Sequence, residues 1–204
     1  RQAVVATEDA RFYRHHGVDL WAILRAAYAN VTGGRIVSGA STISQQTARN
    51  LFMTPEERQD RTVVRKIKEI VLALRLERTL PKDEILALYL NAASYGRLAT
   101  GVAAAAETYF GKPVADLSLA ECAFLAGLPQ SPVRYDPDRN LQAALSRQRT
   151  VLGLMVAAGY LTEAEAAQAA DEPLQFVPYQ TALEAPHFAA MVREQVEALL
   201  PQEE

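Results

Sequence analysis

Apolar residues recur at helical spacing along much of the chain, most clearly between positions 63 and 74. Six of them follow the i, i+1, i+4, i+7, i+8, i+11 spacing of one helix face: Val63, Val64, Ile67, Ile70, Val71 and Leu74. The opposite face carries Arg65, Lys68, Glu69 and Arg75. An apolar stripe backed by charges is typical of an amphipathic helix. The pattern predicts a helix here, and similar spacing elsewhere predicts a mainly helical, all-α fold.

Helix start signals support the same fold class. Ser118 with Glu121 and Thr162 with Glu165 have the spacing of capping boxes, in which each side chain satisfies a backbone donor at the helix start. Pro81 precedes an acidic and then apolar run, and proline is tolerated in the first turn of a helix. We therefore expect helices to begin at all three places.

Three stretches lack helical spacing. Residues 30–39 combine glycines with β-branched residues, which argue against a stable helix, so we expect a mobile loop there. Residues 129–140 and 172–186 each contain three prolines among turn-forming residues and should be irregular. The sequence contains no internal repeat, so it does not predict an array of repeated units.

The composition narrows the function classes. With 204 residues, 50% of them hydrophobic, the chain can bury the core of one domain, or of one domain with a small lobe. A net charge of -3 gives no global basic field, which argues against a nucleic acid partner. The single Cys122 cannot form an internal disulfide, and no apolar run reaches the roughly 18 residues of a membrane span. Because the chain starts without methionine, we expect it to be a piece of a longer protein.

Residues 8–17 form the first group of chemically useful side chains, with Glu8, Asp9, aromatic residues, arginines and two histidines. If Phe12 is buried on a helix, Glu8 lies one turn earlier on the same side, in partly apolar surroundings. A carboxylate in such surroundings can accept a proton from a sugar hydroxyl near neutral pH, as a general base does. The alternative is a solvated acid at a helix end. With only three histidines, a zinc site is improbable.

Residues 39–50 form the second group. Glycine, Ser41 and Thr42 look like a helix start, where free backbone amides and hydroxyls can meet an anion such as phosphate. Gln45 and Gln46 add amide groups suited to sugar hydroxyls. The alternative is an ordinary N-cap with polar surface residues.

The third group lies on the amphipathic helix. Arg65 and Glu69 are at i,i+4 and Lys66 and Glu69 at i,i+3, so their charged ends can converge. Residues 58–78 hold seven basic residues against three acidic ones, an excess that a pyrophosphate would find attractive. The alternative is a set of weakly stabilising surface ion pairs.

In this order, the three groups resemble the motifs of family 51 glycosyltransferases, found in class A penicillin-binding proteins and monofunctional peptidoglycan glycosyltransferases. The matching residues are Glu8, Asp9, Phe12, His15 and Gly17, then Gly39, Ser41, Thr42, Ile43, Gln45 and Gln46, then Arg65, Lys66 and Glu69. Residues 84–91 and 119–129 look like the fourth and fifth motifs. The resemblance spans residues 1–160 and, more loosely, the rest.

The resemblance implies a two-lobed helical fold with a lysozyme-like larger lobe and a small membrane-facing lobe. We expect one glycosyltransferase domain over residues 1–204. Residues 25–60 would form the mobile membrane-facing lobe, and residues 172–204 would lead to a linker.

The resemblance also implies a reaction. Lipid II would be the acceptor and a lipid-linked glycan strand the donor, joined by an inverting displacement that releases undecaprenyl pyrophosphate. Glu8 would deprotonate the acceptor 4-hydroxyl, and Glu69 would help to hold the pyrophosphate, directly or through a divalent cation (Mg²⁺ or Mn²⁺). The remaining substrate-binding residues would be Asp9, Arg49, Arg65 and Lys66, with Ser41, Thr42, Gln45 and Gln46 lining the donor cleft.

The implied setting is the outer face of the bacterial cytoplasmic membrane, reached through an N-terminal anchor helix that this chain lacks. The membrane surface and other cell-wall synthesis proteins would be partners. Arg49 stands where many relatives carry lysine, which keeps the charge but changes the geometry of its contacts. Ser94 stands where relatives often carry a bulkier residue. The chain contains no Ser-x-x-Lys motif of a transpeptidase domain.

Two other functions compete with this one. A lysozyme-like muramidase also uses carboxylates, but the cleavage of a glycan needs no clamp for pyrophosphate such as Arg49, Arg65 and Lys66. A non-catalytic lipid II-binding domain would be expected to have lost Glu8 or Glu69, and both are present.

Overall fold

The computed structural model describes residues 1–25, 41–60, 62–179, 191–192 and 195. Within these ranges the chain is mainly helical, and its only β pairing is an isolated bridge between Ser94 and Thr100. The predicted all-α fold class is confirmed. The α-helices are α1 (Gln2–Glu8), α3 (Ile43–Phe52), α4 (Pro55–Gln59), α5 (Val63–Thr79), α6 (Lys82–Ala92), α7 (Val102–Phe110), α8 (Leu119–Gly127), α9 (Pro137–Ala157) and α10 (Glu163–Asp171). Residues 20–25 are also helical, and short 3-10 turns are η1 (Phe12–Arg14), η2 (Val114–Asp116) and η3 (Leu128–Gln130).

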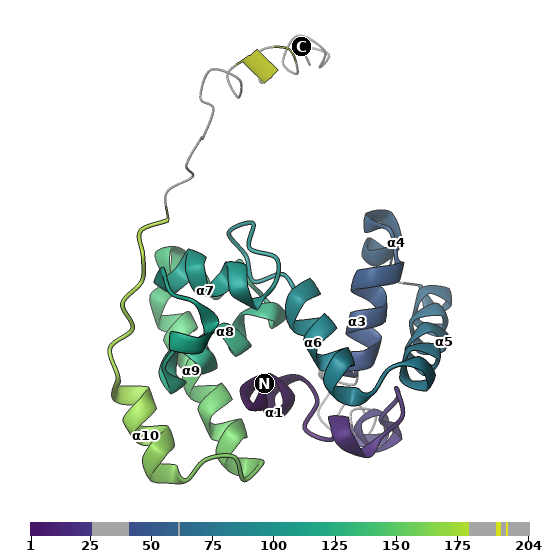
Figure 1. Cartoon of the computed structure of the whole chain (residues 1–204), viewed down its shortest axis with the longest axis horizontal. Coiled ribbons are helices and arrows are strands. Elements are labelled where there is room, and N and C mark those ends of the chain that lie inside the picture. Colours follow the sequence, from purple (N-terminus) through teal and green to yellow (C-terminus); the bar gives the residue numbers. More distant parts are fainter. Residues whose placement is uncertain (26–40, 61, 180–190, 193–194, 196–204) are drawn as a thin grey trace.

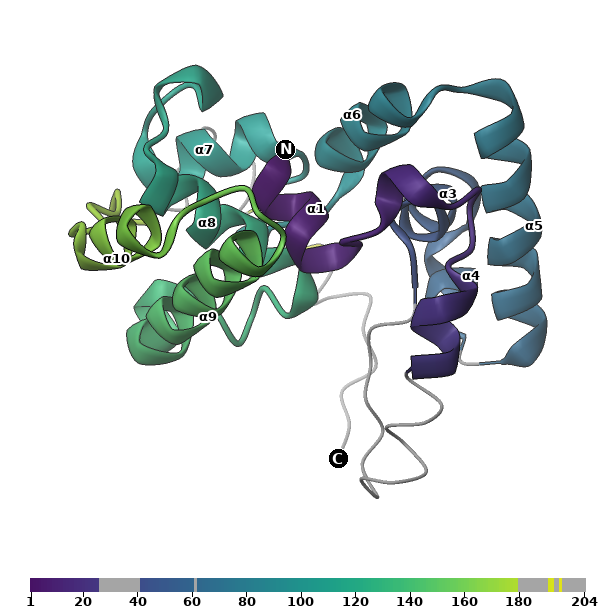
Figure 2. The ribbon, with the colours of Figure 1, turned by 90° about the horizontal axis from the view of Figure 1, so that it is seen from below.

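The helices form two groups (Figure 1). In the smaller group, α3 packs against both α5 and α6. In the larger group, α9 packs against α1, α8 and α10. Helix α1 lies on the side of the larger group that faces the smaller one (Figures 1 and 2). The predicted two-lobed arrangement is therefore present, and α1 lies where the lobes meet.

The core of the larger lobe explains why α1 is held firmly. Seven of the nine residues of α8 are buried, and their apolar side chains contact α1 and α9. The α1 residues Ala3, Val4, Val5 and Ala6 are all buried against them. Phe124 of α8 meets the rings of Tyr109 and Phe110 edge-on, at 5.6 and 5.7 Å between centroids. Burial of this much apolar surface fixes α1 and thereby the direction of its last residue, Glu8.

Helix α5 is the predicted amphipathic helix, but its orientation is unusual. The apolar stripe faces outward: Val63 and Val64 are 75% and 74% exposed, and Ile67 is 56% exposed. Glu69, on the charged face, is only 1% exposed. Helix α5 forms the outer edge of the smaller lobe (Figure 2). A surface helix normally buries its apolar stripe, whereas α5 exposes much of this stripe and buries Glu69, Ala73 and Leu76 instead.

Other predicted elements can be compared directly. Both capping boxes are present, at the starts of α8 and α10, and Pro81 is the N-cap of α6. The prediction of an irregular segment at 129–140 is partly wrong, because η3 ends at Gln130 and α9 begins at Pro137, where Asp136 caps the helix. Residues 172–179 contain no regular structure, as predicted. The expected loop at 30–39 and residues 180–186 lie outside the described ranges.

Candidate active site

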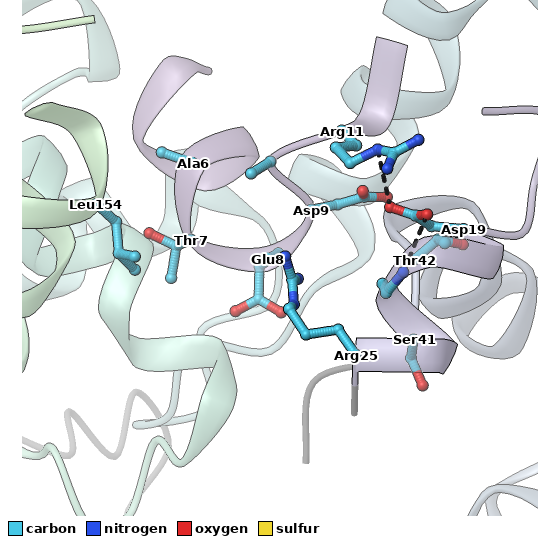
Figure 3. Close-up of a pocket in the computed structure, with 12 residues that line it drawn as sticks. Ala6, Thr7, Glu8, Asp9, Arg11, Asp19, Arg25, Ser41, Thr42 and Leu154 are labelled. Carbon is cyan, nitrogen blue, oxygen red and sulfur yellow. Dashed lines mark hydrogen bonds and ion pairs between the residues drawn. The ribbon is translucent and has the colours of Figure 1, made fainter. Parts of the chain in front are cut away.

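Glu8 is the last residue of α1 and lies between two cavities. One, of about 320 Å³, is lined by Glu8 together with Arg25, Ser41 and Thr42 (Figure 3). The other, of about 360 Å³, is lined by Glu8 and by residues of both lobes, among them Gln46 and Arg147. Gln46 Nε2 donates a hydrogen bond of 2.9 Å to Glu8 Oε2. The carboxylate is thus held at one oxygen while it faces open space on both sides.

The expectation that Glu8 and Phe12 share one helix is wrong. Helix α1 ends at Glu8, Asp9 has a non-helical backbone, and Phe12 starts the separate turn η1. The Asp9 carboxylate has partners outside α1. His15 Nε2 donates to it at 2.9 Å, and the backbone N–H of Ile43 donates at 3.0 Å. The packing of α1 therefore determines the position of Glu8, and Phe12 is buried from a different element, the turn η1.

Asp9 joins the first two sequence groups. Only 8% exposed, it connects the end of α1 to the first residue of α3 and to His15. A carboxylate at a helix N-terminus is favourable because the free amides there carry partial positive charge. Although Asp9 was predicted to bind substrate and does line the smaller cavity, its oxygens already have protein partners.

At the predicted anion site, the start of α3, two of the backbone amides have acceptors within the protein. Thr42 is the N-cap: its hydroxyl accepts from Gln45 N–H and donates to the Gly17 carbonyl at 2.6 Å. The Ile43 amide is taken by Asp9. The amides at N1 and N3 of α3 therefore have acceptors within the protein, while Thr42 also lines the cavity beside Glu8, and its contact with substrate stays a prediction.

The other residues of α3 connect the two glutamates. Gln46 bonds to Glu8, whereas Gln45 accepts a hydrogen bond of 2.9 Å from Lys66 Nζ. Arg49 Nη1 lies 3.8 Å from Glu69 Oε1. These three residues lie within little more than one turn of α3, so α3 fixes the positions of Glu8 and Glu69 relative to each other.

Glu69 lies at the centre of a cluster of three cations. Arg65 donates to Glu69 Oε1, Lys66 Nζ lies 3.1 Å from Oε2, and Arg49 completes the set. Lys66 also donates to Ser41 Oγ at 2.7 Å. The predicted convergence of the third group is confirmed. Glu69 is buried, so these are not surface ion pairs, and one negative charge balances only one of three positive charges.

The residues around Glu69 do not by themselves suit a divalent cation. Both carboxylate oxygens face cations, which would repel a metal ion. Among residues with described side chains, no group of three His, Cys, Asp or Glu could hold a metal. A cation bound here would need the oxygens of a bound pyrophosphate as further ligands.

The structure also places residues at the site that the sequence did not single out. Tyr89 and Tyr95 are fully buried, and neither hydroxyl has a hydrogen-bond partner among the described residues. Burial raises the pKa of both phenols, and the nearby Glu8 charge raises it further. They therefore stay protonated at neutral pH. Arg25 and Arg147 also line the cavities beside Glu8, but no local pattern marks either position.

Comparison with known proteins identifies the family of this chain. A family model described as transglycosylase matches residues 1–156. The chain belongs to the transglycosylase family, and the predicted enzyme class, a peptidoglycan glycosyltransferase, is confirmed at the level of the family.

The individual relatives are penicillin-binding proteins. The chain is 46% identical over 197 residues to penicillin-binding protein 1A of Escherichia coli K12, which covers 96% of the chain and 23% of that protein. It is 50% identical over 172 residues to penicillin-binding protein 1A of Aquifex aeolicus, covering 84% of the chain and 23% of that protein. The chain thus spans about a quarter of the length of these relatives. A crystal structure of penicillin-binding protein 1A from Haemophilus influenzae aligns with 79% of the chain and 20% of its own, at 28% identity and a TM-score of 0.49.

Proposed function

We propose that this chain polymerises lipid II into β-1,4-linked glycan strands by inverting transfer, with release of undecaprenyl pyrophosphate. The proposal rests on one observation. Helix α3 contacts both Glu8, whose carboxylate is hydrogen-bonded by Gln46 at one oxygen, and the positively charged cluster around Glu69. A base at one end and an anion clamp at the other are the two groups that this displacement requires.

Glu8 is the base in this scheme. The 4-hydroxyl oxygen of the acceptor sugar attacks C1 of the donor while Glu8 takes the hydroxyl proton. The bond between C1 and the phosphate oxygen breaks, and its electron pair leaves with the pyrophosphate. Gln46 orients the Glu8 carboxylate through its hydrogen bond, which leaves the other oxygen for the hydroxyl.

The cluster of Arg49, Arg65 and Lys66 stabilises the leaving group. Three cations around one carboxylate leave an excess of two positive charges, opposite in sign to a pyrophosphate. Because Glu69 is buried, it holds the cations in place before the substrate binds, which is the pre-organisation that makes electrostatic stabilisation effective. Ser41 and Gln45 help by fixing the Lys66 ammonium.

The contacts around the acidic residues argue against a muramidase. Hydrolysis on such a scaffold needs a second available carboxyl group opposite the acid. Glu69 is enclosed by cations, and Asp9 is bonded to His15 and the Ile43 amide. Neither is available as a second carboxyl group for water activation.

A membrane surface is the second partner that we propose, which would account for the exposed apolar stripe of α5. Large apolar side chains are exposed on this lobe at Leu20, Trp21, Leu24, Phe52, Val63, Val64 and Ile67. None of the helices in the described ranges has both the length and the apolar character to cross a bilayer. Apolar side chains of this kind can enter the interface region of a bilayer, next to a lipid-linked substrate. The site would then lie at the outer face of the cytoplasmic membrane.

The first test is a polymerisation assay with labelled lipid II, followed by digestion of the product with a muramidase. Wild type should form polymer, and Glu8→Gln should form none while it keeps its thermal stability, because an amide oxygen can still accept from Gln46. Glu163→Gln, an exposed change in the first turn of α10, is the matched control and should polymerise normally. Polymer from Glu8→Gln at a near wild-type rate would remove Glu8 as the base. Binding of lipid II without turnover by wild type would favour the non-catalytic alternative.

The membrane partner is tested separately with vesicles of phosphatidylethanolamine and phosphatidylglycerol. The double variant Val64→Glu and Ile67→Glu should lose flotation with the vesicles. Val133→Glu, at a 68% exposed apolar position between η3 and α9, should float like wild type. Equal flotation of all three proteins would contradict the proposal.

A further inference from the structure

Arg147 lies in the cleft on the wall opposite α3. The cavity of about 360 Å³ beside Glu8 is closed on one side by Ser41, Gln46 and Arg49 and on the other by Pro129, Gln130 and Arg147. The first set comes from the smaller lobe and the second from η3 and α9 of the larger lobe. A substrate that reaches Glu8 from this side passes between the two sets.

The stem of Arg147 has a place built for it. Its Nε donates a hydrogen bond of 3.3 Å to the carbonyl of Gly127, the last residue of α8. A Cβ on Gly127 would lie 2.8 Å from Arg147 Cγ, so glycine is what leaves room for the side chain. The Tyr135 ring lies 5.8 Å from the guanidinium carbon. Because Nε is used by the protein, the terminal nitrogens are the donors that remain.

Those donors have no anion of their own. Within the described ranges, no carboxylate comes within 4.0 Å of the Arg147 guanidinium, whereas Arg65 and Arg49 face Glu69, and Arg97 faces Asp136. Arg147 is also only partly exposed. A partly buried, pre-oriented guanidinium without a counter-ion is suited to two parallel hydrogen bonds with a carboxylate or a phosphate.

We propose that Arg147 binds an anionic oxygen group of the bound substrate and so positions the sugar against Glu8. This inference rests on the proposed function, because the substrate is the lipid-linked muramyl peptide. Such a substrate carries anionic oxygens in two places, the pyrophosphate and the carboxylates of the peptide. The chemistry that Arg147 recognises is the same in both.

The test measures the Kd of fluorescent lipid II in detergent alongside the kcat and KM of polymerisation. Arg147→Gln should raise Kd and KM roughly 10- to 100-fold, the range expected for a hydrogen-bonded contact to a charged group, with a smaller change in kcat. Arg147→Lys should restore part of the affinity. Gly127→Ala keeps the guanidinium but displaces its stem, and it should raise Kd in the same direction.

The matched control is Arg149→Gln, two residues further along α9, where the side chain lines a separate cavity with residues 170–174. Its Kd and KM should stay at wild-type values. If Arg147→Gln binds lipid II as tightly as this control, or if its loss of binding only follows a loss of thermal stability, the inference is overturned.

Substrate chemistry separates the two anion sources. The Kd measurement is repeated with lipid II whose peptide carboxylates are converted to amides. If Arg147 binds a peptide carboxylate, Arg147→Gln should no longer change Kd. If Arg147 binds the pyrophosphate, the change in Kd should persist. Both results support an anion site at Arg147. A wild-type protein that binds lipid II but does not polymerise it would refute the proposed function alone, since Kd still tests Arg147. Absence of binding by wild type would overturn both.

Discussion

Removal of the Glu69 charge should reveal what holds the cation cluster together. In Glu69→Gln the shape of the side chain is kept, but Arg49, Arg65 and Lys66 lose their shared counter-ion. Removing one partner of a buried ion pair costs about 3–5 kcal/mol. Here the cations are 19–37% exposed, so solvent screens part of their repulsion. We therefore expect a loss of about 2–3 kcal/mol, somewhat below the buried-pair range.

The assay is thermal unfolding with and without inorganic pyrophosphate. For a chain of this size the expected loss corresponds to a fall in Tm of about 4–12 °C. The vacated cluster then carries three uncompensated charges, so pyrophosphate should stabilise the variant more than wild type. A ligand at about 100 times its Kd contributes about 2.7 kcal/mol, which would restore most of the lost stability.

Glu77→Gln is the matched control. Glu77 is also on α5, and its side chain is only 5% exposed, but it pairs with Lys82 and Ser44 rather than with the cluster. It should lose stability without gaining a response to pyrophosphate. The reasoning is refuted if Glu69→Gln melts at the wild-type temperature, or if pyrophosphate raises the Tm of both variants equally.

Three further predictions concern stability. Tyr95→Phe removes a buried hydroxyl that has no hydrogen-bond partner among the described residues. Urea unfolding should therefore show unchanged stability or a gain of up to about 1 kcal/mol. A loss of stability of more than about 1 kcal/mol would mean that the hydroxyl is hydrogen-bonded. Asp136 is a partly buried carboxyl, and although burial opposes this, hydrogen bonds from Arg97 and a backbone amide lower its pKa below 3.8. The stabilisation by Asp136 is therefore fully present above the pKa of the unfolded state and is lost as the pH falls through the pKa of the folded state. Asp136→Asn should be less stable than wild type at pH 7 and equally stable in strong acid, and a stability difference that stays constant with pH would contradict this. Gly101 has φ +86°, and a Cβ there would lie 2.8 Å from the Asn91 carbonyl oxygen. Gly101→Ala should therefore lower the free energy of unfolding by about 2–3 kcal/mol. Wild-type stability of this variant in thermal unfolding would show that the backbone can relax.

Local features of the sequence determined much of this protein. The capping boxes of α8 and α10 depend on side chains three residues apart, and the convergence of Arg65, Lys66 and Glu69 follows from helix geometry alone. Once a helix forms, these contacts form independently of the rest of the chain. The mainly helical fold class was predictable for the same reason.

The tertiary structure decided which of these features could be used for chemistry. Asp9 meets the Ile43 amide across 34 residues and Glu8 meets Gln46 across 38, so neither partner is visible in a local pattern. Those contacts tie the start of α3 to Asp9 and hold Glu8 beside the cleft. Periodicity indicated two faces of α5 but not which one is buried. Packing against α3 and α6 buries Glu69, Ala73 and Leu76, and Arg49 of α3 faces the buried Glu69, so the buried side of α5 depends on partners outside its own sequence.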